Sequence, residues 1–179
     1  MKHLTEHFIA GEVVFDGKLL KVHRDEVRLP DGTRGVREYI RHPGAVAVVA
    51  LFDDGTVLLE RQFRYPHRRE FIEVPAGKLE PGEPHLHTAK RELVEETGYA
   101  AAEWTRLGVI HTAIAYTDEA IELFLARKLA KQRAAQLDAG EFVETLIVPF
   151  DDALAMVRDG RITDAKTVAA LLWVHLWSR

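Results

Sequence analysis

Residues 77–99, GKLEPGEPHLHTAKRELVEETGY, constrain the fold of this chain more than any other segment. Helical spacing over residues 85–97 places Glu92, Glu95 and Glu96 on one side of a helix and apolar residues on another side. Carboxylates three or four residues apart repel each other, so a helix in solvent usually alternates them with lysine or arginine. We therefore expect a helix that packs its apolar side on a core and directs its acidic side toward a compensating partner.

A divalent cation would compensate this negative charge. Mg²⁺ takes oxygen ligands, prefers one or two carboxylates, and completes its shell with waters and substrate phosphate oxygens. The segment therefore favours a site at which Mg²⁺ holds a phosphate-bearing substrate, although the three glutamates alone would equally fit a solvated helix. The histidines at positions 3, 7, 85 and 87 are expected at the surface, since no third ligand of matching spacing indicates zinc.

The full pattern of the segment decides between these alternatives. From residue 77 to residue 99 it reads G-x5-E-x7-R-E-L-x-E-E-x-G-Y. This pattern resembles the Nudix box, G-x5-E-x7-R-E-U-x-E-E-x-G-U, in which U is a bulky apolar residue, and every specified position is filled. The resemblance implies a Nudix hydrolase, with an α+β fold built as an α/β/α sandwich around a mixed sheet. Such an enzyme cleaves a nucleoside diphosphate linked to another moiety.

The resemblance also implies the metal-binding and catalytic groups. Glu92 and Glu96 would be the principal ligands of Mg²⁺, with Mn²⁺ able to substitute. Glu95 would lie beside them, and the Ala76 carbonyl would complete the metal site. Arg91 would orient these carboxylates by pairing with a glutamate of the same segment, because outer groups that hold ligands in place matter as much as the ligands.

Three stretches outside the box extend the resemblance. Residues 37–51, 60–83 and 140–144, which include RQFRYP and EVPAG, are similar to the ADP-ribose pyrophosphatase branch of the Nudix family. This similarity implies Mg²⁺-dependent hydrolysis of the diphosphate bond of ADP-ribose, or of a related nucleotide sugar. The products would be AMP and ribose 5-phosphate.

Four residues of these stretches match substrate-binding or catalytic groups of that branch. Arg37 and Arg64 match arginines that contact the diphosphate or the terminal ribose, and guanidinium groups suit bidentate phosphate binding. Glu73 matches a carboxylate near the mouth of the site. Glu141 matches a loop glutamate proposed as the general base, and a base on a mobile loop can close over bound substrate.

One loop departs from the branch. Residues 111–119, HTAIAYTDE, retain Asp118 and Glu119 but lack the Ser-Pro-Gly sequence that often precedes them in the branch. We expect these two residues to contact substrate or, alternatively, to form only a turn between strands. The altered loop leaves the preferred nucleotide sugar open.

Two other functions therefore remain as alternatives. One is pyrophosphatase activity toward a different nucleotide sugar, such as GDP-mannose, ADP-glucose or UDP-glucose. The other is a sensor that binds ADP-ribose without cleaving it, although the complete set of box glutamates argues against a sensor. RNA-end processing lacks support because no basic or aromatic channel for a single strand is visible.

Composition excludes several other classes of protein. The net charge is −4 and the lysines and arginines are dispersed, so neither nucleic acid nor a membrane surface is expected as a partner. The chain contains no cysteine, which excludes disulfides and thiolate chemistry. No apolar run resembles a signal peptide or approaches the roughly 18 residues of a membrane span. We expect a cytoplasmic homodimer that acts on a small-molecule nucleoside diphosphate sugar.

The chain has the length of one ordinary domain with a small appendage. Residues 1–42 contain short alternating runs separated by turn sequences, and they are expected to form a small antiparallel β-sheet for dimerisation and substrate contacts. Residues 43–179 are expected to form the Nudix domain. Within it, the apolar run 45–52 predicts a strand buried on both faces. Asp151 is predicted as the N-cap of one helix and Asp164 as the start of an amphipathic terminal helix.

Overall fold

The computed structural model describes residues 3–137 and 139–177 of the chain. It divides into two compact units. The first, here called the N-terminal unit, comprises Met1–Gly44 and His111–Glu119; the second, the main unit, comprises Ala45–Ile110 and Ala120–Arg179. Each unit is described by itself.

The N-terminal unit contains a three-stranded antiparallel sheet of β1 (His7–Asp16), β2 (Lys21–Arg28) and β3 (Arg34–Arg41), in that order. The two connections are the predicted turns. The Gly17 amide donates to the Leu20 carbonyl over 2.9 Å, and Gly32 adopts the left-handed conformation with φ +88°. The small antiparallel sheet predicted from the sequence is thus confirmed.

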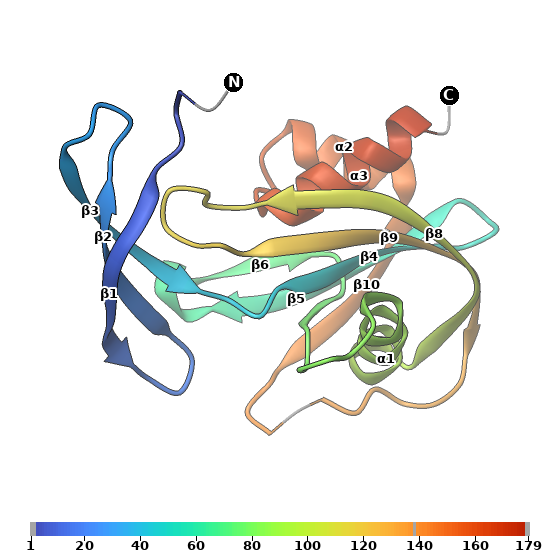
Figure 1. The fold of residues 1–179 in the computed structure, drawn as a ribbon. Coiled ribbons are helices and arrows are strands. Elements are labelled where there is room, and N and C mark those ends of the chain that lie inside the picture. Colours follow the sequence, from blue (N-terminus) through green and yellow to red (C-terminus); the bar gives the residue numbers. More distant parts are fainter. Residues whose placement is uncertain (1–2, 138, 178–179) are drawn as a thin grey trace. The chain divides into compact units, whose positions relative to one another are not determined.

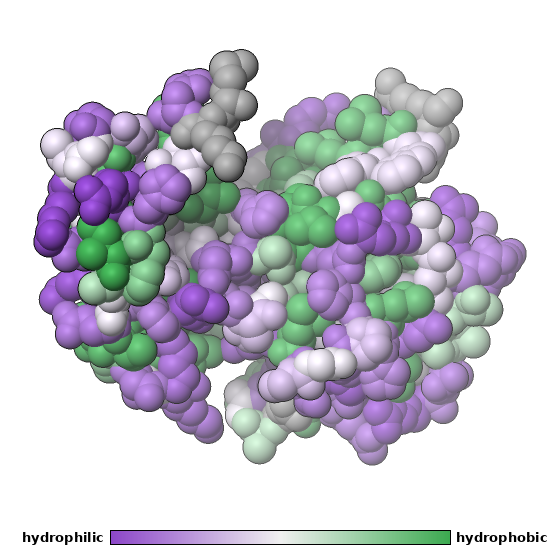
Figure 2. Space-filling model, in the orientation of Figure 1, coloured by the Kyte–Doolittle hydropathy of each residue, from purple (hydrophilic) through white to green (hydrophobic). Residues whose placement is uncertain are grey.

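Much of the apolar surface of this sheet is exposed. Phe8, Val13 and Phe15 of β1 are each more than half exposed, and so is Val36 of β3. Figure 2 shows apolar areas among the polar surface of this unit. A three-stranded sheet with apolar side chains left in solvent is typical of a surface that has a partner.

The main unit is built on a mixed sheet of seven strands with the order β10-β5-β4-β9-β8, in which β6 pairs with β5 and β7 pairs with β4. β4 and β9 are parallel, whereas β5 pairs antiparallel with β4, β6 and β10. The strands are β4 (Ala45–Leu51), β5 (Thr56–Arg64), β6 (Arg69–Glu73), β7 (Ala76–Lys78), β8 (Tyr99–His111), β9 (Ala120–Lys131) and β10 (Val143–Pro149), with a 3-10 turn, η1 (Tyr65–His67), between β5 and β6.

Helices cover both faces of this sheet. α1 (His85–Thr97) lies on one face, and α2 (Phe150–Arg158) and α3 (Ala165–Trp177) lie on the other (Figure 1). The predicted α/β/α sandwich around a mixed sheet is therefore confirmed, and α1 has the bounds predicted from its spacing.

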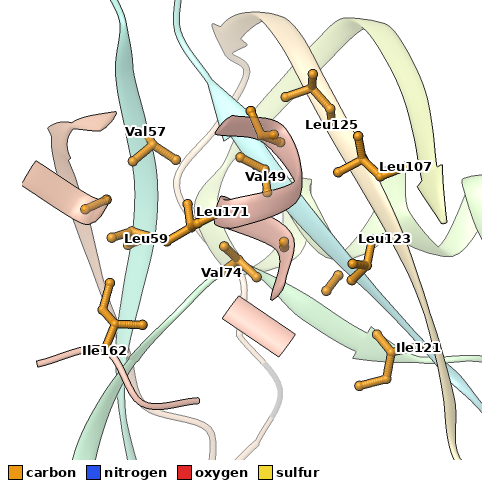
Figure 3. Close-up of a cluster of buried hydrophobic side chains, with 14 of the residues drawn as sticks. Val49, Val57, Leu59, Val74, Leu107, Ile121, Leu123, Leu125, Ile162 and Leu171 are labelled. Atoms are coloured by element: carbon orange, nitrogen blue, oxygen red, sulfur yellow. The ribbon is translucent and has the colours of Figure 1, made fainter. Parts of the chain in front are cut away.

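Two hydrophobic clusters fill the spaces between the sheet and its helices. Residues of β4 alternate between them: Val49 belongs to the cluster under α2 and α3, which Figure 3 shows around Leu171, and Val48 belongs to the cluster under α1, with Leu93. This alternation explains why the strand reads as a continuous apolar run, since both of its faces are buried.

The ends of the helices follow local rules at two positions and depart from them at a third. Gly98 ends α1 with φ +72° and donates its amide to the Val94 carbonyl. Asp164 accepts hydrogen bonds from the backbone amide and hydroxyl of Thr167, which confirms it at the start of α3. The prediction for Asp151 is wrong: α2 already begins at Phe150 after Pro149, so Asp151 lies in the first turn, where its charge favours the positive end of the helix.

The terminal helix is less amphipathic than predicted. Ala170, Leu171 and Val174 are buried, yet Leu172 and Leu176 on other sides of the helix remain exposed. Among the described residues, no helix is long and apolar enough to cross a membrane.

Candidate active site

The short strand β7 places backbone atoms directly against two glutamates of α1. The Ala76 amide donates a hydrogen bond to Glu96 Oε2 over 3.1 Å. A Cβ atom added at Gly77 would overlap the carboxylate of Glu92, so only glycine leaves room for that side chain. β7 is itself held by antiparallel pairing with β4. The structure thus brings together Glu92 and Glu96, the predicted principal metal ligands, and Ala76, whose carbonyl was predicted to complete the site.

Arg91 links three acidic side chains of the same segment. Its Nε and Nη2 donate to the two carboxylate oxygens of Glu83, both over 3.1 Å, and its Nη1 donates to Glu95 over 2.9 Å. Nη1 also lies 3.0 Å from Glu92 Oε1. The hydrogen bonds from Arg91 lower the pKa of Glu83 to about 2. Arg91 can therefore hold Glu92 and Glu95 in position, as the sequence predicted for an orienting residue.

Burial and mutual repulsion disfavour the charged forms of the two carboxylates that face β7, those of Glu92 and Glu96. Burial raises the pKa of Glu96, and the negative charges of Glu60, Glu92 and Glu141 raise it further. Burial also raises the pKa of Glu92, although Arg91 opposes this shift. A cation placed between these oxygens would favour their charged forms.

The donor set fits a hard divalent cation. Carboxylate oxygens and a backbone carbonyl are the ligands that Mg²⁺ prefers, and Mg²⁺ keeps part of its shell for waters and phosphate oxygens. Within residues 3–137 and 139–177, no three His, Cys, Asp or Glu side chains are already gathered as a metal-binding group. A cation here would accordingly be held by Glu92, Glu96 and the Ala76 carbonyl, with solvent or substrate oxygens completing its shell.

These residues line a cavity of about 400 Å³, within the range of small-molecule sites. The cavity also contains Arg64 and Glu141, so the structure brings the predicted phosphate-binding arginine and the predicted general base to the metal ligands. Its lining comprises Gln62, Arg64, Ala76, Gly77, Lys78, Leu79, Glu80, Arg91, Glu92, Glu96 and Glu141. Glu95 and Glu73 are not among the lining residues; Glu95 pairs with Arg91, and Glu73 lies behind Arg64.

Arg64 is held by a buried ion network rather than left free in the cavity. Its Nε and Nη2 each donate a 2.7 Å hydrogen bond to Glu73, one to each carboxylate oxygen. The buried Lys166 also donates to Glu73, and it donates to Asp164 over 3.0 Å. Although burial opposes the shift, Arg64 and Lys166 lower the pKa of Glu73. Glu73 is therefore charged and fixes the direction of Arg64.

The remaining predicted residues belong to the N-terminal unit, and each has a partner there. Arg37 pairs with Glu6 through two hydrogen bonds. The Asp118 carboxylate accepts from the His42 amide over 2.7 Å, and Glu119 accepts from the Thr112 hydroxyl. Asp118 and Glu119 therefore stabilise the loop that carries them. This agrees with the alternative given above, in which they form only a turn between strands.

Three residues in or near the cavity were not predicted from the sequence: Glu60, Gln62 and Lys166. Glu60 and Gln62 alternate with Leu59 and Arg61 along β5, and Glu60 is almost fully buried. Glu60 could have been recognised because it directly follows the apolar run VLL and, by strand alternation, lies on the same face as Leu58. Lys166 had no comparable signal, because a lysine in the first turn of a helix is ordinarily solvated.

Known proteins resemble this chain over nearly its whole length. The model of the NUDIX domain matches residues 41–171, and that of the nucleoside diphosphate sugar hydrolase N-terminal domain matches residues 9–40. The ADP-ribose pyrophosphatase of Bacillus subtilis (strain 168) is 43% identical over 177 residues, which cover 98% of this chain and 96% of the relative. The methanol dehydrogenase activator of Bacillus methanolicus is 41% identical over 176 residues, covering 98% and 95%.

A solved structure supports the fold independently. The crystal structure of an ADP compounds hydrolase superimposes with a TM-score of 0.85 over 97% of this chain and 95% of that chain, at 24% identity. At this identity the similarity concerns the fold, which is the same sandwich found above. The family model covers well over half of this chain and includes the box and its flanking strands. The chain therefore belongs to the Nudix family of hydrolases.

Proposed function

We propose that this Nudix hydrolase cleaves the diphosphate bond of ADP-ribose, or of a closely related nucleotide sugar, to AMP and ribose 5-phosphate. The observation that carries the proposal is the cavity in which Arg64 and Glu141 face the carboxylates of Glu92 and Glu96. The 43% identity to an ADP-ribose pyrophosphatase supports the choice of substrate.

Nudix hydrolases act with a divalent metal ion, and we assign Mg²⁺ here, with Mn²⁺ as a substitute. Glu92, Glu96 and the Ala76 carbonyl would hold it, with Glu95 beside them. When bound, the ion neutralises diphosphate charge and lowers the pKa of a bound water. Arg91 would keep these carboxylates oriented for the metal, because it bonds to Glu95 as well as to Glu92.

The other residues would bind substrate and move the proton. Arg64, already aligned by Glu73, presents a guanidinium to the diphosphate, and Arg37 would serve a second phosphate or the ribose. Glu141 lines the cavity and would take the proton from the attacking water as the general base. Asp118 and Glu119 would contribute to substrate contacts through the loop that they hold together.

The N-terminal unit has a separate proposed role. We infer that residues 1–42 contribute to a homodimer interface and to substrate contacts, while residues 43–179 form the hydrolase domain. The exposed apolar side chains of β1 and Val36 of β3 support this role. A cytoplasmic location agrees with the chemistry of a soluble nucleotide sugar substrate.

The test is a panel of ADP-ribose, ADP-glucose, GDP-mannose and UDP-glucose, each incubated with Mg²⁺ or with a chelator. The products become visible as phosphate after treatment with a phosphomonoesterase, which does not attack the intact diphosphates. We expect Mg²⁺-dependent cleavage with the highest kcat/KM for ADP-ribose. A higher value for another sugar would reassign the substrate, and absence of cleavage for all four would contradict the proposed activity.

A regulatory function is the second candidate, since the relative from Bacillus methanolicus is an activator of another enzyme. In that case the chain would bind ADP-ribose without hydrolysing it. Calorimetric titration of ADP-ribose in the presence of Ca²⁺, together with the hydrolysis panel, separates the two candidates. Binding with no turnover in Mg²⁺ would favour regulation.

A further inference from the structure

Glu60, a buried acidic residue of the central sheet, has no role in the function proposed above. Glu60 lies in β5 on the same face as Leu58, which packs in the cluster under α1. Gln62 and Arg64 follow at the next alternate positions, and both line the cavity. Strand alternation therefore directs Glu60 toward the side of the sheet that carries the metal-binding carboxylates.

Glu60 is almost fully buried, and acidic side chains are rarely buried to this extent unless they are paired. Only 5% of it is exposed. Its Oε1 atom is buried and has no hydrogen-bond partner among the described residues. A buried carboxylate oxygen without a donor costs stability, so its presence needs an explanation.

The cations near Glu60 are engaged by other groups. Glu73 stands opposite Glu60 in the β5–β6 pairing, and it receives the hydrogen bonds of Arg64 and Lys166. Burial, followed by the negative charges of Glu141 and Glu73, raises the pKa of Glu60. Glu60 in turn adds to the repulsion felt by Glu96. Lys166 and Arg64 oppose the rise of the Glu60 pKa only in part, because their hydrogen bonds go to Glu73.

We propose that Glu60 is a further anionic group of the divalent-cation site, which adds negative charge behind Glu96 and strengthens cation binding by the substrate-free enzyme. This inference rests on the proposed placement of the metal at Glu92 and Glu96. It explains why an unpaired acidic side chain persists in the sheet: the cation that Glu96 binds also compensates Glu60.

The test measures metal binding without turnover. Mn²⁺ is titrated into the full chain in the absence of substrate, and free Mn²⁺ is followed by its electron paramagnetic resonance signal. We expect Glu60→Gln and Glu60→Leu to raise the Kd for Mn²⁺ about tenfold, as for other groups that surround metal ligands. Glu70→Gln, which removes an exposed acidic residue from the neighbouring strand β6, is the matched control and should leave the Kd unchanged.

Thermal unfolding supplies a second readout that a purely structural role would not produce. In chelator, both Glu60 variants should unfold at the wild-type temperature or above it, because they remove the repulsion between the Glu60 carboxylate and the neighbouring Glu73 and Glu96. Saturating Mn²⁺ should raise the unfolding temperature of these variants less than that of wild type. A Kd within twofold of wild type, or variants that lose stability in chelator and bind Mn²⁺ normally, would overturn the proposal.

The Mn²⁺-binding test of Glu60 and the hydrolysis test of the proposed function can fail independently of each other. If wild type binds Mn²⁺ in a Glu60-dependent manner but cleaves none of the nucleotide sugars, the activity is wrong and the role of Glu60 stands. If wild type cleaves ADP-ribose and the Glu60 variants bind Mn²⁺ as tightly as wild type, the activity stands and the role of Glu60 is wrong.

Discussion

Arg64 donates two hydrogen bonds of 2.7 Å to the carboxylate of Glu73, and the same carboxylate accepts a hydrogen bond from the buried Lys166. The pair connects adjacent strands of the sheet, whereas Lys166 comes from the first turns of α3. A cavity arginine is thus oriented by a helix on the opposite face of the sheet. The orientation of Arg64 in the cavity therefore depends on how α3 is packed.

The first prediction concerns this network. Glu73→Gln should reduce the free energy of unfolding by about 3 kcal/mol, because it leaves the buried Lys166 with only part of its compensating charge. Lys166→Met should cost less, about 1–2 kcal/mol, since Arg64 still compensates Glu73. Urea unfolding of the two variants and of the double variant measures the coupling between them. Glu70→Gln is the control for β6, and strictly additive losses would contradict the network.

A second prediction addresses the metal ligands. Glu96→Gln should lower turnover of the nucleotide sugar more than about 100-fold, because even groups outside the ligand shell change activity by 10–100-fold. The metal-free variant should remain at least as stable as wild type, since burial and neighbouring charges already disfavour the charged form of Glu96. Steady-state kinetics and thermal unfolding in chelator check both parts. The exposed Glu103→Gln on β8 serves as a control that should retain full activity.

A third prediction compares two glycines: at Gly77 an added Cβ would overlap another side chain, whereas at Gly82 only the backbone conformation disfavours another residue. Gly77→Ala should displace the Glu92 carboxylate and greatly reduce Mn²⁺ affinity and turnover, because the added Cβ would occupy its position. Gly82→Ala meets no atom within 4 Å but has φ +79°, so it should lose about 1 kcal/mol of stability and keep its activity. Metal binding and unfolding are measured for both variants. Equal activity of the two would show that the Glu92 position is not limited by residue 77.

A fourth prediction concerns the dependence of stability on pH. Hydrogen bonds from Arg91 lower the pKa of Glu83 from its ordinary value of 4.5 to about 2 in the folded protein. A lowered carboxylate pKa stabilises the fold above the unfolded value, and this contribution is lost as pH falls from about 4.5 to about 2. Glu83→Gln should therefore be less stable than wild type at pH 6, and the difference should shrink toward pH 3. A difference that stays constant between pH 6 and pH 3 in urea unfolding would contradict the assignment.

Several elements could be predicted from the sequence because they obey local rules. The helix at residues 85–97 and its end at Gly98 follow from apolar spacing and from the left-handed conformation that glycine tolerates. The buried strand at 45–51 follows from a run that is apolar on both faces. Asp151 was predicted wrongly as an N-cap, since the N-cap is Pro149 at the end of β10 and α2 starts two residues earlier than predicted.

By itself, the sequence determined the box and its carboxylates, because these reside in spacings within one continuous segment, and the sandwich fold followed from the family that the box resembles. The tertiary structure alone decided that Arg64 is held by Glu73 and Lys166 and that Glu60 is buried beside Glu96. Those partners lie on different strands and helices, with Lys166 following Glu73 by 93 positions. The burial and charge compensation of a side chain depend on which elements close over it, and no local pattern in β5 or α3 specifies that environment.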